Sequence, residues 1–172
     1  MTNNDRAFAK AFLDECERRL FEESLPRLER CLSLLTPEEI WHRPNAETVS
    51  VGNLVLHLCG NVRQWIVAAL GGKPDTRERA KEFSEPGPIP TQTLLQHLRS
   101  SMQLVKEVLH DLDPSTLLEQ RTVQGFEESG VSILVHVVEH FSYHVGQITY
   151  FVKSNKAIDL AYYGGKDLNR TG

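Results

Sequence analysis

The hydrophobic positions follow a helical period along most of the chain. From Asp5 to Leu35 apolar residues recur at helical spacing, which predicts a helix. Pro26 lies inside this run, and we expect a kink or break there because proline lacks the amide hydrogen and crowds the preceding turn. Thr36-Pro37-Glu38-Glu39 combines a cap, a first-turn proline and acidic residues, so it predicts a short helix.

Three more long helices are predicted after this region, each starting at a hydroxyl residue. The first is capped by Ser50 and runs to about Leu70, and the second is capped by Thr91 and ends just before Asp113. The third is capped by Ser129 and runs from about Val131 to Ser154. Residues 71–90 are rich in proline and charge and predict a surface connection with about one helical turn. We see no strand and no repeat. We therefore predict one all-α domain over residues 1–172, a four-helix bundle, with an irregular all-α domain as the alternative.

Composition and charge narrow the class of protein. Hydrophobic residues make up 40% and charged residues 24%, as in ordinary globular proteins. A net charge of −4 without a basic run argues against a nucleic-acid partner. A polar N-terminus, no membrane-length apolar run and three scattered cysteines predict a cytoplasmic protein with reduced thiols and no membrane partner.

The second long helix carries a polar stripe on an otherwise apolar sequence. Asn53, His57, Asn61 and Gln64 share one face, whereas Arg63 points away and is expected to be solvated. Buried polar groups without partners cost about 1–3 kcal/mol each, so this stripe needs partners. For a lone histidine, a hydrogen-bonded core residue is the commoner explanation.

The last helix carries a matching stripe of His136, His140, His144 and Gln147. Two such stripes on facing bundle helices can build a metal site. Because the outer histidines are about 12 Å apart along the axis, one ion can take one adjacent pair together with His57. The pair His136/His140 would form the zinc-protease pattern H-x-x-E-H with Glu139 as base, although a solvated Glu139 is the simpler interpretation.

The pair His140/His144, followed by Val-Gly-Gln, resembles the signature of the DinB/YfiT-like superfamily. The stretch Ser50-Val-Gly-Asn-Leu-Val-Leu-His57-Leu and the preceding Trp41-His-Arg-Pro44 support the resemblance, which covers roughly residues 5–155. The chain departs from the commoner His-His-Arg-Gly-Gln pattern by having Tyr143-His144-Val145, and it adds His136. These departures retain the histidines and leave the substrate open.

The resemblance implies a four-helix bundle that binds one divalent metal, zinc or nickel, through His57, His140 and His144. Some relatives are thiol S-transferases that use a low-molecular-weight thiol, others are thiol-dependent isomerases or metal-dependent hydrolases, and many form homodimers. We therefore expect a homodimer that acts on a small-molecule substrate, with thiol S-transfer favoured. The alternatives are metal-dependent hydrolysis, a non-catalytic metal-binding protein and a purely structural bundle. No catalytic side chain is assigned.

Three further polar residues are expected around the ion. Gln147 is expected to orient a ligand histidine or a bound water, and Asn61 to orient His57. His136 is expected to line the pocket, or else to bond a carbonyl group. Gly60 and Gly146 predict close helix packing or space beside the ion, because glycine inside a helix costs about 1 kcal/mol.

Overall fold

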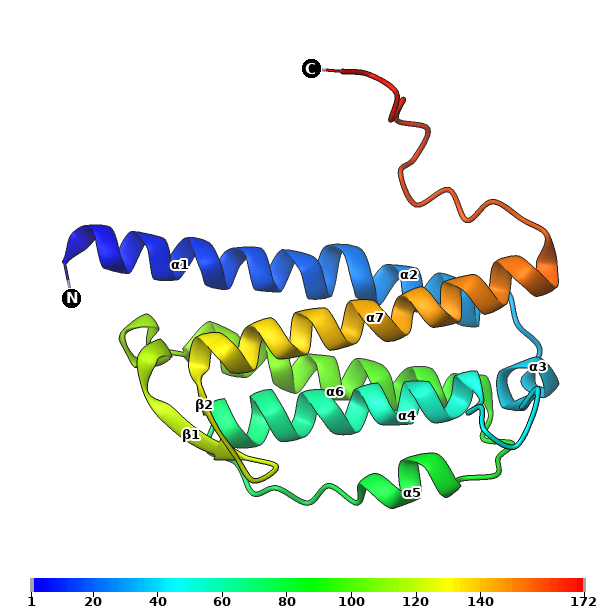
Figure 1. Cartoon of the computed structure of the whole chain (residues 1–172), viewed down its shortest axis with the longest axis horizontal. Helices are drawn as coiled ribbons and strands as arrows, with labels where there is room; N and C mark the ends of the chain where they lie inside the picture. The colour runs from blue at the N-terminus through cyan, green and yellow to red at the C-terminus, as the bar shows by residue number, and fades with distance from the viewer. Residues whose placement is uncertain (1, 172) are drawn as a thin grey trace.

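The computed structural model describes residues 2–171, which form a four-helix bundle, as predicted (Figure 1). The four bundle helices comprise α1 with η1 and α2, α4 with η2, α6, and α7. Their bounds are Asn3–Glu17, Arg18–Ser24 and Leu25–Leu32 for the first, Val51–Val62 and Arg63–Leu70 for the second, Thr91–Asp111 for α6 and Gly130–Lys156 for α7. Packed leucine, isoleucine and valine side chains from all four helices form the core, with Phe141 fully buried among them.

Pro26 neither breaks nor ends the first helix, contrary to the expected break. The helix widens just before it into the π-helical segment η1, in which the Leu25 amide donates to the Leu20 carbonyl. A five-residue step leaves room for a proline ring that an α-helical turn would crowd. The helix therefore continues through Pro26 into α2, where Pro26 occupies the first turn.

The predicted caps are correct at three of the four helix starts. Thr36 caps α3 (Pro37–Trp41), Ser50 caps α4 and Ser129 caps α7, each accepting a backbone amide. Thr91 was expected to be a cap and instead is the first residue of α6. The N-cap residue is Pro90, and no side chain caps this helix. Proline fits this position because it has the φ angle of a helix start.

A two-stranded hairpin corrects the expectation that the chain has no strand. β1 (Gln120–Val123) pairs antiparallel with β2 (Phe126–Ser129) after a short 3-10 helix, η3 (Pro114–Leu118). Gln124 and Gly125 form the turn with positive φ angles of 51° and 82°. Each strand has only four residues, and β2 has no alternation of buried and exposed positions. The hydrophobic pattern therefore did not predict the hairpin.

Residues 71–90, called the strap below, run along the outside of α4 and contain α5 (Arg79–Ser84) (Figure 1). Asn53 on α4 donates to the carbonyls of Glu82 and Glu85, both at 2.9 Å. The Trp41 indole donates to the Ile89 carbonyl at 3.2 Å and leaves no room for a side chain at Gly87. The strap is therefore a surface connection with one short helix, as expected, and it is also anchored to the bundle. Among residues 2–171, no helix combines the length and apolar character needed to cross a membrane.

Trp41→Ala is expected to lower the free energy of unfolding by about 3 kcal/mol, because it removes a large packed ring. It should also speed amide exchange over residues 82–89, which the ring anchors. Chemical denaturation and hydrogen–deuterium exchange measure the two effects. The control Tyr150→Ala removes an aromatic ring that is 76% exposed and should change little. Equal exchange in both variants would contradict the anchoring role.

Candidate metal centre

Three histidine side chains converge on the seam between α4 and α7. His140 Nε2 lies 3.1 Å from Nε2 of His57 and 3.2 Å from Nε2 of His144. His57 comes from the second turn of α4, and the other two lie one helical turn apart midway along α7. Because α4 and α7 are in contact, their polar stripes face each other inside an apolar bundle.

The second ring nitrogen is engaged in two of the three imidazoles. His57 Nδ1 lies 2.9 Å from Glu82 Oε2, and His144 Nδ1 lies 2.7 Å from Gln147 Oε1. Since carboxylate and carbonyl-type oxygens accept hydrogen bonds, both Nδ1 atoms carry the proton and both Nε2 atoms present lone pairs. His140 Nδ1 is buried without a protein partner.

This donor set fits a transition metal. Two nitrogen ligands at about 2.0–2.1 Å on a tetrahedral ion are about 3.3 Å apart, close to the spacing of adjacent Nε2 atoms here. Imidazole nitrogen suits zinc and nickel. Among the described residues the cluster contains these three ligands, and their nitrogen atoms all lie within 4.8 Å of one another. Three histidines of this chain could therefore hold a metal ion.

Burial favours the neutral, metal-binding form of the two α7 imidazoles, His140 and His144. It lowers the pKa of His140 to about 3, and the neighbouring His144 and His57 add to the effect. Burial also lowers the pKa of His144, against a raising effect of the Gln147 hydrogen bond. At neutral pH His140 and His144 are therefore neutral, the form in which an imidazole binds an ion.

Glu82 and Arg77, both on the strap, complete the surroundings of His57. Arg77 Nε donates to Glu82 Oε1 at 2.7 Å, and Arg77 Nη2 donates to Glu82 Oε2 at 2.9 Å. Burial alone would raise the pKa of Glu82, but the hydrogen bonds from Arg77 and His57 outweigh it and the pKa is lowered. A Cβ atom at Gly60 would lie 1.9 Å from Glu82 Oε1, so this glycine makes room for the pair.

Sequence reasoning missed Glu82 and Arg77. They lie in a segment without hydrophobic periodicity, where charged residues usually face solvent. Gly60 was the one available signal, because a glycine inside a buried helix indicates a close approach. A groove of about 990 Å³ between the strap and α6 is lined by Arg77 and Glu82 but by none of the three histidines.

The predicted surrounding residues lie partly as expected. Gln147 contacts His144, in line with the expected orienting role. Asn61 does not contact His57, contrary to expectation; its Nδ2 lies 3.3 Å from His136 Nε2 because it is one turn further along α4. The His136 ring stacks on Trp65, with the ring centroids 3.8 Å apart, and on His140, with the centroids 5.4 Å apart, so it lies beside the metal cluster.

The alternative zinc-protease register is not favoured by this geometry. His136 Nε2 faces Asn61 rather than the point shared by the other three histidines, and Glu139 is exposed. Gly146 has open space around it, so the expectation of close packing there is wrong. Gly60, in contrast, is packed as expected, although against the strap rather than another bundle helix.

The four-helix bundle that carries these histidines has a DinB-like fold. In a comparison of structures, the chain resembles a DinB-like protein from Bacillus cereus ATCC 10987 with a TM-score of 0.65 and 18% identity, over 88% of this chain and 94% of that one. Residues 7–162 match the family described as Protein of unknown function (DUF1572), and the chain belongs to this family. A search of curated proteins found no match.

The stability of the metal-free protein is expected to fall as the pH is lowered from about 6.5 toward about 3. In this range unfolded histidine binds a proton, whereas folded His140 stays neutral, so protonation favours the unfolded state. Chemical denaturation at several pH values in the presence of a chelator measures the slope of the free energy of unfolding against pH. His140→Gln should reduce it, and His110→Gln, on the exposed face of α6, is the matched control. An unchanged slope in His140→Gln would contradict the assignment.

Proposed function

We propose that this protein is a metal-dependent enzyme that transfers a low-molecular-weight thiol to an electrophilic small molecule. Zinc or nickel would be held by His57, His140 and His144. The observation that carries the proposal is the three-nitrogen cluster at a partly exposed position. Structural zinc sites are closed by four protein ligands, whereas catalytic sites use three and leave one position open.

The surroundings of the cluster suit a small molecule. The Phe83 ring packs against His57 with centroids 4.7 Å apart, and the Tyr143 ring lies 5.0 Å from that of His144. A pocket of about 330 Å³ lies next to Gln147, which contacts His144; its other lining residues come from the loop at residues 42–49 and from apolar positions of α4 and α7. Bound substrates are held mainly by apolar walls with a few polar groups, as here.

The chemistry requires a nucleophilic sulfur and a fixed site. A bound ion would supply Lewis acidity and lower the pKa of a thiol. In the transfer the thiol loses its proton to solvent, the sulfur forms a bond to carbon, and the leaving group departs with the electron pair of its bond to carbon. Glu82 and Gln147 hold two of the imidazole rings in place, and the rings of Phe83 and Tyr143 lie beside those of His57 and His144.

Electrostatics favours thiol transfer over hydrolysis. The Arg79 guanidinium lies 4.8 Å from the Phe83 ring centroid, which places a cation near the site for the carboxylates that such thiols carry. Hydrolysis normally needs a carboxylate base beside the ion. The described carboxylate that contacts the cluster is Glu82, and it already accepts hydrogen bonds from Arg77 and His57. A hydrolase and a non-catalytic metal-binding protein are the weaker alternatives.

The expected partners and compartment stay predictions from the sequence. We keep the homodimer, the cytoplasmic location and the absence of nucleic-acid and membrane partners as part of the proposal. None of these is needed for the site, because its histidines and their hydrogen-bond partners all come from one chain.

Titration of the cobalt(II)-substituted protein with glutathione or another low-molecular-weight thiol tests the proposal. Thiol binding at the ion should produce a sulfur-to-cobalt charge-transfer band in the near ultraviolet. His144→Ala should abolish the band, and His97→Ala, on α6, is the matched control. A second assay follows thiol consumption with a reactive electrophile. A protein that binds cobalt but shows neither the band nor turnover would contradict thiol transfer and support a non-catalytic role.

A further inference from the structure

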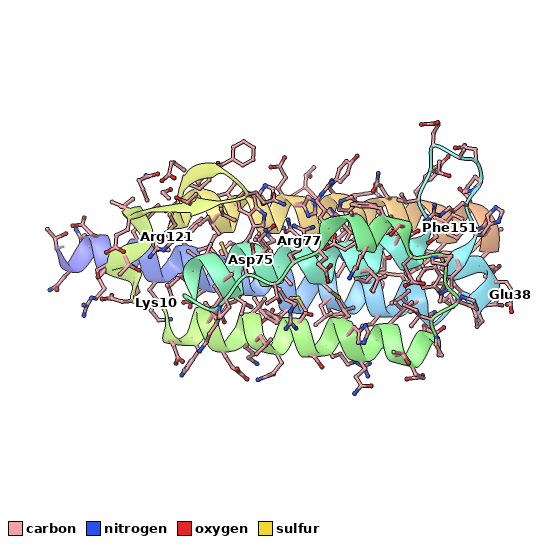
Figure 2. All side chains as sticks on the ribbon, turned by 90° about the horizontal axis from the view of Figure 1, so that it is seen from below. Lys10, Glu38, Asp75, Arg77, Arg121 and Phe151 are labelled. Carbon is pink, nitrogen blue, oxygen red and sulfur yellow. The ribbon has the colours of Figure 1, made fainter. Side chains whose placement is uncertain are left out.

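Arg77 is buried in an unusual way for an arginine in a connecting segment. Its side chain is 3% exposed and that of Glu82 is 10% exposed, although the surrounding strap is largely solvated. Besides both oxygens of Glu82, it donates to Gln64 Oε1 on η2 at 2.9 Å. Figure 2, which looks onto the α5 side, shows Arg77 midway along the bundle, between Arg121 toward one end and Phe151 toward the other. A solvated role would not require such burial.

The contacts of Arg77 determine how Glu82 meets His57. The two carboxylate oxygens have different partners: Oε1 accepts from Arg77 Nε, and Oε2 accepts from both Arg77 Nη2 and His57 Nδ1. This two-pronged pairing fixes the plane of the carboxylate. The carboxylate lies directly against Gly60. A residue other than glycine would not fit there, because its Cβ atom would overlap Glu82 Oε1.

The carboxylate in turn selects one tautomer of His57. Arg77 Nη2 lies 3.1 Å from His57 Nδ1, so an unprotonated Nδ1 could in principle accept from the guanidinium. Its lone pair would then face Glu82 Oε2 at 2.9 Å, which is repulsive. With the carboxylate held in place, the proton is kept on Nδ1 and Nε2 turns its lone pair to His140 and the ion.

We propose that Arg77 is a positioning residue of the metal centre, which acts through Glu82 to keep His57 in its metal-binding tautomer and orientation. The inference rests on the proposed function in its use of a bound metal. It goes further by assigning a role to the strap, which nothing in the histidine pattern indicates. Arg77 itself would not bind the ion. It fixes the Glu82 carboxylate, which accepts the hydrogen bond from His57 Nδ1.

Two measurements on the full-length protein test this inference. Zinc affinity, measured by competition with a chromophoric chelator, should fall by about 10–100-fold in Arg77→Met and in Glu82→Ala. Because both residues act along one path, the double variant should bind zinc no more weakly than Glu82→Ala alone. Arg63→Met, at an exposed position of η2, is the matched control and should keep wild-type affinity.

The tautomer of His57 is measured without metal, by nitrogen-15 NMR of histidine-labelled protein. Wild type should show the proton on Nδ1, and Arg77→Met should show a growing share on Nε2. Arg77→Lys keeps the positive charge but cannot make the two-pronged contact, so its share of Nε2 protonation should fall between those of wild type and Arg77→Met. This variant replaces Arg77→Met in the test if Arg77→Met does not fold.

The outcomes separate this inference from the proposed function. Wild-type protein that binds no zinc would overturn the metal site, while the NMR measurement would still test the Arg77 relay. Zinc binding that is unchanged in folded Arg77→Met, fully additive losses in the double variant, or a proton on Nε2 of wild-type His57 would each overturn the positioning role.

Discussion

Three imidazole Nε2 atoms directed at one point are the constraint on which the rest of this structure depends. Nε2 of His140 lies 3.1 Å from that of His57 and 3.2 Å from that of His144, so one proton on His140 Nε2 can bridge to only one of them at a time, whereas a metal ion between the rings can bind all three. A second proton on His140 is disfavoured at neutral pH, because burial lowers its pKa to about 3. The arrangement is therefore matched to a metal ion, and the surrounding protein has to hold the three rings in place.

The strap meets part of this requirement. A buried Arg77–Glu82 pair costs desolvation energy that hydrophobic residues in the same place would not. Its geometry explains why such a pair is useful here, since it gives His57 an acceptor that cannot rotate away. Asn53 and Trp41 anchor the strap to the bundle through its carbonyls at Glu82, Glu85 and Ile89. The fold thus links a connecting segment to the ligand geometry of the α4–α7 seam.

The sequence predicted the features that repeat and missed those that do not. The periodic leucines and valines predicted the bundle helices, and the four-residue spacing of His136, His140 and His144 placed a polar stripe on one of them. The convergence of His57 with His140 and His144 followed from that stripe together with family resemblance. Spacing alone left the His136/His140 pair open; in the structure His136 Nε2 is turned to Asn61 and its ring stacks on Trp65 and His140.

The missed features depend on contacts between segments far apart in the chain. Glu82 reaches His57 across 25 positions, and the one local signal of the contact is Gly60 on α4. The π-helical widening before Pro26 and the hairpin at residues 120–129 also arise from local geometry that a hydrophobic period does not encode. Asn61 was expected to orient His57, four residues before it on α4, but its hydrogen-bond partner is His136 on α7, which no spacing within α4 could indicate.

Anomalous diffraction from crystals of the zinc- or nickel-loaded protein, recorded on both sides of the metal absorption edge, tests the central claim most directly. We predict one strong anomalous peak per chain, within about 2.0–2.1 Å of Nε2 of His57, His140 and His144. A peak bound instead by His136 and His140, or a fully loaded crystal with no peak on the α4–α7 seam, would contradict it.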